Sequence, residues 1–150
     1  FFPSQTIYTN LCTLIIEMIN SFKRITIVKI DKAGTQPVNQ EIQWFSNSLG
    51  LFNLRDKEKS CFRIFVELLK ASKIDKPLSS DEIAYKLNLT RGTVVHHLNR
   101  LMDAGIVVSK RNKYMLRTNN LVQLIDLLKK DANEFFTSMK NIAEEIDKQI

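Results

Sequence analysis

The chain has 150 residues, of which 44% are hydrophobic, so it can bury one core and is too apolar to be disordered throughout. Its two cysteines, Cys12 and Cys61, form no Cys-x-x-Cys pair, which argues against a disulfide framework or a zinc knuckle. We expect two buried thiols in a reducing cytoplasm. The most apolar run, residues 11–19, is shorter than the about 20 residues that span a bilayer, so no membrane partner is expected.

The net charge of +6 is concentrated in one part of the chain. Residues 55–117 contain 14 Lys and Arg against 7 Asp and Glu, whereas the remaining residues contain 8 against 9. An even distribution would imply no polyanionic partner, but this one is uneven. The basic excess therefore belongs to a single stretch, and a polyanionic partner would bind there.

The N-terminal third predicts a helix, a strand and a connector. Apolar residues recur at helical spacing over residues 5–22, and the pattern of residues 24–30 is β-branched and alternating, as in a strand. The helical positions are Ile7, Leu11, Ile15, Met18 and Phe22. Residues 35–53 contain Pro37, Gly50 and several asparagines and serines, which favours a loop-rich connector with a short helix. No function follows from these residues.

From Asp56 the periodicity becomes clear and predicts two helices. Asp56 is a candidate N-cap for a helix that ends near Ser72, with Phe62, Phe65, Val66 and Leu69 on one face. After a break, Ser79 or Ser80 can cap a second, short helix whose first turn carries Asp81 and Glu82. The acidic side chains suit the positive end of the helix dipole.

A third helix and a hairpin follow after a tight turn. Thr90 can cap a helix that runs to Ala104, where Gly105 fits the left-handed closing position. Two short strand-like runs, 106–108 and 113–117, are joined by the basic segment 109–112. The order of helix, turn, helix and basic hairpin predicts a winged helix-turn-helix.

The C-terminal residues predict one long helix that begins after Thr118. Its apolar residues alternate four and three apart for almost four heptads, which is typical of a helix that pairs with another helix. The apolar positions are Leu121, Ile125, Leu128, Ala132, Phe135, Met139, Ile142 and Ile146. We expect Leu121, Ile125, Leu128, Phe135, Met139 and Ile142 to form a homodimer contact.

On a helical wheel, the helix that begins at Thr90 separates into an apolar and a polar arc. The apolar arc consists of Val94, Val95, Leu98, Leu101 and Met102. The polar arc consists of Gly92, Thr93, His96, Asn99 and Arg100, with Thr90, Arg91 and His97 at its edges. These side chains can enter a major groove and donate hydrogen bonds there. The alternative is a merely solvated face, but such faces usually carry more Glu and Lys.

The segment LTRGTVVHHLNRLMDAGIV, residues 89–107, resembles the recognition helix and wing entry of ArsR-type winged-helix regulators, whose pattern is roughly L-S-x-S-T-V-S-x-H-L-x-x-L-x-x-A-G-[IL]-V. Gly92 and Val95 occupy positions where that family usually has serine. The resemblance implies that Arg91, Thr93, His96 and His97 contact bases or nearby phosphates. It also implies phosphate contacts from the helix start at Thr90. The flexible charged side chains of Arg100, Lys110, Arg111 and Lys113 suit phosphate or minor-groove contacts, which position the protein without reading sequence.

Neither a metal site nor a catalytic site emerges from the sequence. His96 and His97 are the only histidines, and neighbouring residues on a helix point about 100 degrees apart, so they do not easily close on one ion. The paired cysteines of metal-sensing ArsR relatives are absent from residues 79–104. No Gly-rich phosphate loop, G-x-S-x-G or H-E-x-x-H motif occurs, so we expect neither an enzyme nor a cofactor.

We therefore expect an α+β, mainly helical protein. Residues 1–54 would form an N-terminal extension, residues 55–117 the winged helix-turn-helix, and residues 118–150 a dimerisation helix. The expected function is a cytoplasmic, homodimeric repressor that binds double-stranded DNA, with no effector identified. Two alternatives stay open: a winged-helix module that binds other proteins in a transcription assembly, and a ligand or redox sensor that uses Cys12 or Cys61.

Overall fold

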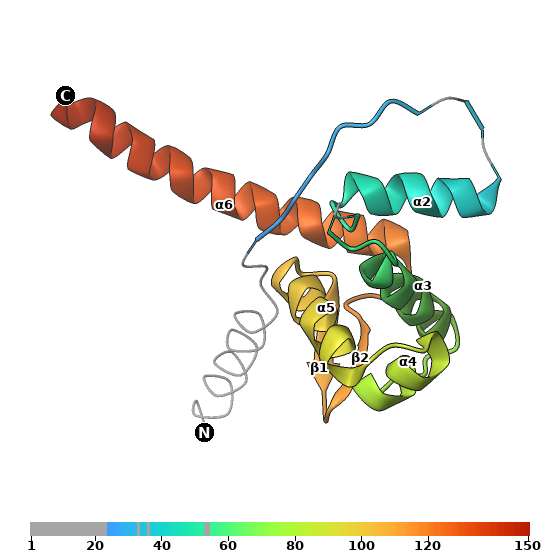
Figure 1. The fold of residues 1–150 in the computed structure, drawn as a ribbon. Helices are drawn as coiled ribbons and strands as arrows, with labels where there is room; N and C mark the ends of the chain where they lie inside the picture. The colour runs from blue at the N-terminus through green and yellow to red at the C-terminus, as the bar shows by residue number, and fades with distance from the viewer. Residues whose placement is uncertain (1–23, 33, 36, 53–54) are drawn as a thin grey trace, which may run out of the picture.

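The computed structural model describes residues 24–32, 34–35, 37–52 and 55–150. It is mainly helical, with one two-stranded antiparallel sheet (Figure 1). The elements are α2 (Val38–Ser48), α3 (Ser60–Lys73), α4 (Ser80–Leu87), α5 (Arg91–Asp103), β1 (Val107–Lys110), β2 (Lys113–Leu116) and α6 (Leu121–Gln149). The expected mainly helical α+β fold with a winged helix-turn-helix and a long C-terminal helix is confirmed.

The caps predicted for α4 and α5 are present. The Ser79 hydroxyl accepts the N–H of Glu82, and the Glu82 carboxylate accepts the N–H of Ser79, which completes a capping box. The Thr90 hydroxyl accepts the N–H of Thr93 at 3.1 Å. Between the two helices, Asn88 has a φ of 53°, a left-handed conformation that asparagine tolerates better than most residues. These local signals fix the tight turn between α4 and α5.

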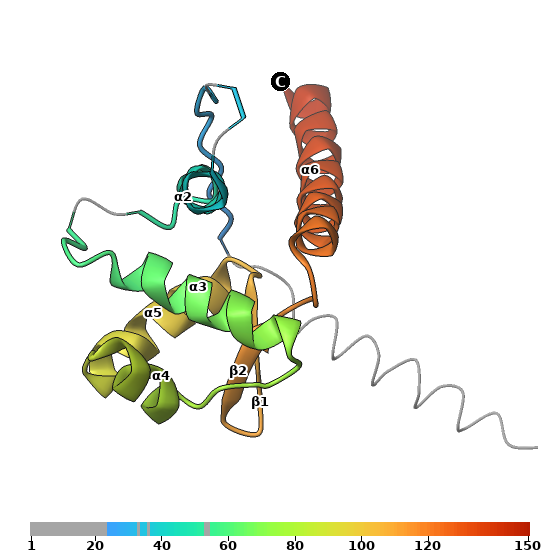
Figure 2. The same ribbon diagram turned by 90° about the vertical axis from the view of Figure 1, so that its right-hand side faces the viewer.

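The core lies where α3 packs on α5 and β2, with α4 at one end; Figure 1 shows α3 beside α5, and Figure 2 shows α3 in front of α5. Phe65 and Ile64 of α3 and Leu98 of α5 are fully buried in it. Leu68, Leu78, Ile83, Val94, Leu101, Ile106, Leu116 and Leu124 are also in this core. Because α5 presents its apolar side to this core, its polar side is turned outward.

The wing is a short hairpin with a two-residue tip. β1 and β2 pair from Val107 opposite Leu116 to Lys110 opposite Lys113. Arg111 and Asn112 between them have φ values of 53° and 60°, as two-residue hairpins with a type I′ turn require. Leu78 adds an isolated bridge to Tyr114, so the segment before α4 is hydrogen-bonded to the wing.

Helix α6 packs on the domain only through its first turns. Leu124 and Leu128 are buried in the core of the domain, so the sequence-based expectation that Leu128 contacts a second copy is wrong. Arg117 forms an ion pair with Asp131. Beyond Leu128 no residue of α6 is buried by the described part of the chain, and the helix extends away from the domain (Figure 1). The predicted cap is wrong by two residues: the side chain of Asn120, not that of Thr118, accepts the N–H of Gln123.

Three other sequence-based expectations need correction. Residues 24–30 are in no sheet among the described residues, although the N–H of Val28 is bonded to the carbonyl of Ser48. The connector that follows contains the 11-residue helix α2, which is more regular than we expected. Helix α3 begins at Ser60, with Lys59 at the N-cap position that the sequence assigned to Asp56. The helix predicted for residues 5–22 lies outside the described residues.

Candidate nucleic-acid interface

The outward side of α5 carries most of the residues that the sequence proposed for DNA contact. Thr90, Arg91, Gly92 and His96 are exposed, and Thr93 and Arg100 are half-buried. A Cβ placed on Gly92 would meet nothing within 4 Å, so the protein's own packing does not require a glycine there. Figure 2 shows α4 and α5 on the side of the domain opposite to α6. This face is therefore not covered by the long helix.

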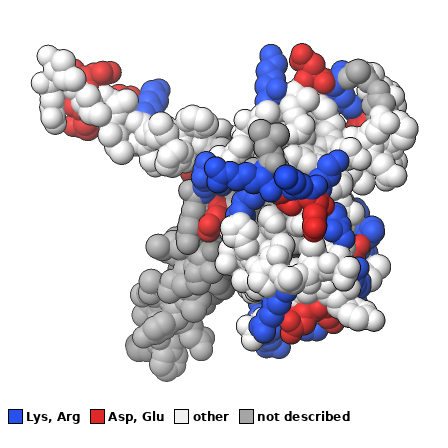
Figure 3. Space-filling view, in the orientation of Figure 1, with Lys and Arg blue, Asp and Glu red and all other residues white. Residues whose placement is uncertain are grey.

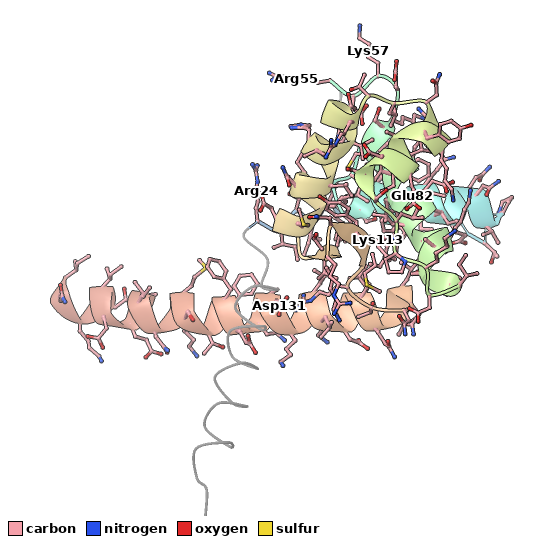
Figure 4. All side chains as sticks on the ribbon, turned by 90° about the horizontal axis from the view of Figure 1, so that it is seen from below. Arg24, Arg55, Lys57, Glu82, Lys113 and Asp131 are labelled. Atoms are coloured by element: carbon pink, nitrogen blue, oxygen red, sulfur yellow. The ribbon has the colours of Figure 1, made fainter. Side chains whose placement is uncertain are left out.

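The cations of the wing are also exposed. Lys110, Arg111 and Lys113 all lie at or beside the hairpin tip. The pKa of Glu82 is lowered, first because the backbone N–H of Ser79 is bonded to its carboxylate and further by the charge of Lys113, which faces it across the gap between α4 and the wing (Figure 4). The negative charge of Glu82 thus partly offsets the positive charge of Lys113. Lys110 and Arg111 form no ion pair that the structure records among the described residues.

Arg91 forms one weak ion pair at the start of α5. Its Nε lies 3.5 Å from a carboxylate oxygen of Asp81, and the two side chains are 71% and 74% exposed. Exposed pairs of this kind contribute about 0 to 1 kcal/mol, because water and salt screen them. Arg91 can therefore exchange Asp81 for a phosphate or a base at little cost.

His97 does not lie on the outward face, which corrects the sequence-based expectation that it contacts DNA. Its side chain is buried, and its Nε2 lies 3.8 Å from a carboxylate oxygen of Asp56. The wheel of α5 alone placed it at the edge of the polar arc, but the segment before α3 folds over that edge. Asp56, which does not cap α3 as an N-cap, still binds its first turn: its two oxygens accept the N–H groups of Ser60 and Cys61 at 2.9 and 3.0 Å.

Both partners of this pair have lowered pKa values. Burial lowers the pKa of His97, and the nearby Asp56 offsets this only in part. For Asp56, burial alone would raise the pKa, but the N–H groups of Cys61 and Ser60 and the charge of His97 together lower it. Nδ1 of His97 is buried and has no hydrogen-bond partner among the described residues. The neutral imidazole is therefore the form that the folded protein favours.

We expect His97 to make the fold sensitive to mild acid. Because its pKa is lower in the folded than in the unfolded chain, its contribution is present above the unfolded pKa of about 6.5 and is lost as pH falls through the folded pKa. The free energy of unfolding should thus decrease between pH 7 and pH 5, and His97→Gln should flatten that decrease. Urea denaturation at several pH values measures it, with the exposed neighbour His96→Gln as control. An unchanged slope in His97→Gln would contradict the prediction.

The structure also shows exposed residues that sequence reasoning did not select. Tyr85, at the end of α4, is 90% exposed beside the turn that leads into α5. Arg55 and Lys57 precede α3 and line a hollow together with Thr93 and His96 of α5. Tyr85, Arg55 and Lys57 belong to no sequence motif, so only the three-dimensional structure shows that they lie near α5. The one signal available was the basic excess that begins at Arg55.

Cys61 is buried, as expected, whereas Cys12 lies outside the described residues. Burial raises the pKa of the Cys61 thiol to about 11. Within the described ranges, no cluster of His, Cys, Asp and Glu is placed to hold a metal ion. No helix in the described part of the chain is long and apolar enough to cross a membrane.

The order α3, turn, α4, turn, α5 and hairpin, with a polar outward side on α5, defines a winged helix-turn-helix, the DNA-binding domain of many transcriptional regulators. Residues 66–109 match the family model described as bacterial regulatory protein, arsR family. The chain thus carries an ArsR-type helix-turn-helix, which confirms the resemblance found in the sequence and points to a DNA-binding transcriptional regulator rather than an enzyme. No curated protein and no solved structure matches the chain.

Proposed function

We propose that this protein is a cytoplasmic, homodimeric repressor that binds a pseudo-palindromic DNA site. In this proposal residues 55–117 are the DNA-binding unit, residues 118–150 pair two copies, and residues 1–54 are an extension. The observation that carries the proposal is the exposed, hydrogen-bonding side of α5 beside a basic hairpin. A helix of this size fits the major groove of B-DNA, which is about 12 Å wide.

The residues of α5 have different roles in this proposal. Arg91, Thr93 and His96 contact base edges, because their side chains are accessible and can donate or accept hydrogen bonds. The first turn of α5, at Thr90 and Gly92, offers backbone N–H groups to a phosphate. Arg100, Lys110, Arg111 and Lys113 contact phosphates, which positions the protein without specifying sequence.

The dimer is supported by the apolar side of α6. Met139, Ile142 and Ile146 are 48%, 62% and 50% exposed, although they are spaced as in a coiled coil. Ile125 and Phe135 continue the same stripe towards the domain. We propose that a second copy of the chain covers this stripe. Pairing would hold two α5 helices at about one turn of DNA, roughly 34 Å, so that they enter successive major grooves.

The test of the base contacts is a comparison of cognate and random duplex. A site is first selected from a random DNA pool, and a palindrome with half-sites one helical turn apart is the expected product. Arg91→Ala and His96→Ala should then weaken binding to that site more than to random duplex, by about 1–3 kcal/mol for each base contact. Fluorescence anisotropy at fixed salt measures both affinities.

The exposed Lys73→Ala, at the C-terminal end of α3, serves as the control for this comparison. It should leave both affinities unchanged. Equal losses on the cognate and the random duplex would reduce Arg91 and His96 to phosphate contacts. Selection that enriches no sequence would contradict the proposed function and favour a winged-helix module that binds proteins instead.

A further inference from the structure

A band of cations runs across the face of the molecule that carries the outward side of α5. Most of these cations lie outside residues 66–109, the part of the chain that matches the family model. It consists of Arg24, Arg55, Lys57 and Arg100, which we call the cationic band. Figure 3 shows Lys and Arg gathered across the middle of this face. In Figure 4, Arg55 and Lys57 project from the side of the domain that is opposite to α6, and Arg24 projects from its flank, beside the end of α5. The band is thus on the face that the proposed function assigns to DNA.

Two hollows connect the band to the outward side of α5. His96 and Arg100 line both of them. One hollow is completed by the segment that carries Arg55 and Lys57, and the other by Arg24. The row formed by His96 and Arg100 therefore lies between the two groups of cations, and the band is continuous with the residues proposed to contact DNA.

The backbone holds these cations in place. The N–H of Arg24 donates to the carbonyl of Asp103 at the end of α5, with a distance of 3.0 Å. Asp56, between Arg55 and Lys57, is bonded to the N–H groups of Ser60 and Cys61, which ties that segment to the start of α3. The two outer parts of the band are therefore attached to α5 and to α3.

The acidic groups near the band do not cancel it. Asp56 lies in the hollow, but its charge is directed to the first turn of α3 and to His97. Glu58 is exposed beside Lys57, and Asp103 lies beside Arg24. The four cations outnumber these three carboxylates, so this group of side chains carries a net positive charge.

We propose that the cationic band binds the phosphate backbone of the DNA, alongside the groove that α5 enters. This inference rests on the proposed function and extends its interface to residues before α3. DNA is favoured over a small free anion because the cations are spread in a band across several elements, as a strand of phosphates requires, rather than gathered around one point. The band supplies affinity without sequence preference.

The experiment measures how DNA affinity depends on salt. For B-DNA, each phosphate contact contributes about 0.9 to the slope of log K against log salt. The double variant Arg55→Gln/Lys57→Gln should bind cognate and random duplex more weakly by similar factors, with the slope reduced by roughly 2 for each protomer. Circular dichroism should show unchanged thermal unfolding, because both side chains are exposed.

The control is Lys130→Gln/Lys148→Gln, which removes the same charge from exposed positions of α6. It should keep the slope of the unmodified protein. If the control and the Arg55/Lys57 variant show the same reduction in slope, only net charge matters, and the band is not a contact.

An unchanged slope in the Arg55/Lys57 variant, while the unmodified protein binds its selected site, overturns this inference and leaves the proposed function standing. The inference is also overturned if inorganic phosphate at constant ionic strength stabilises the unmodified protein but not the variant, and the DNA slope stays unchanged. If the unmodified protein binds no DNA, the inference and the proposed function both fail.

Discussion

Replacing Ile142 by aspartate is expected to convert the proposed dimer into monomers. Ile142 lies in the exposed apolar stripe of α6, which a second copy would cover. A carboxylate buried there without a partner costs about 3–5 kcal/mol, so the dimer dissociation constant should rise by at least about 100-fold. Affinity for the palindromic site should fall with it, because a monomer contacts only one half-site. Sedimentation equilibrium measures the first effect and anisotropy the second.

The matched control is Thr137→Asp, which places the same charge on the opposite side of α6. Thr137 is exposed, and its hydroxyl donates to the carbonyl of Asn133 within its own helix. This variant should remain dimeric. A dimer that survives Ile142→Asp, or an unmodified chain that is monomeric at tens of micromolar, would contradict the assignment of α6 as the pairing element.

Leu98→Ala is expected to destabilise the domain more than any single change on its DNA-facing side. Leu98 is fully buried on the inner side of α5, where α5 packs on α3. Truncating a buried leucine to alanine typically costs 2–5 kcal/mol, since transfer energy is lost and a cavity remains. The neighbouring Asn99→Ala, on the exposed side of α5, should change the free energy of unfolding by less than about 0.5 kcal/mol. Urea denaturation gives both values.

The outcome also tests which side of α5 belongs to the core. Loss of DNA binding in Leu98→Ala should follow the loss of folded protein and be recovered at lower temperature or with less denaturant. Comparable destabilisation by Leu98→Ala and Asn99→Ala would mean that both sides of α5 are packed, which is incompatible with a groove-facing helix.

The helix-turn-helix was predictable from the sequence because its signals are local. Three such signals are the capping box at Ser79, the cap at Thr90 and the left-handed Gly105. Each depends only on residues within about four positions of itself. The apolar period of α5 then fixed which side is buried. Each of these levels pointed to the same fold, which is the condition under which sequence patterns are reliable.

The sequence-based predictions were wrong where contacts between segments that are distant in the sequence determine the structure. His97 has a polar side chain at the edge of a polar arc, and only the fold of the segment around Asp56 shows that it is buried. Residues 24–30 have the composition of a strand, but their backbone bonds to Ser48 rather than to another strand. Leu124, outside the predicted heptad stripe, is the α6 residue most buried against the domain. A one-dimensional period cannot separate the contact with the domain from the contact with a second helix.

The tip of the wing has an arginine where the backbone favours glycine. Arg111 adopts a left-handed conformation, which costs an L-residue with a Cβ about 1 kcal/mol relative to glycine. The hairpin thus gives up some of its own stability and gains a guanidinium at the turn of the ribbon, where a glycine would leave none. Arg111→Gly would therefore stabilise the hairpin, but it would remove one positive charge from the tip of the wing.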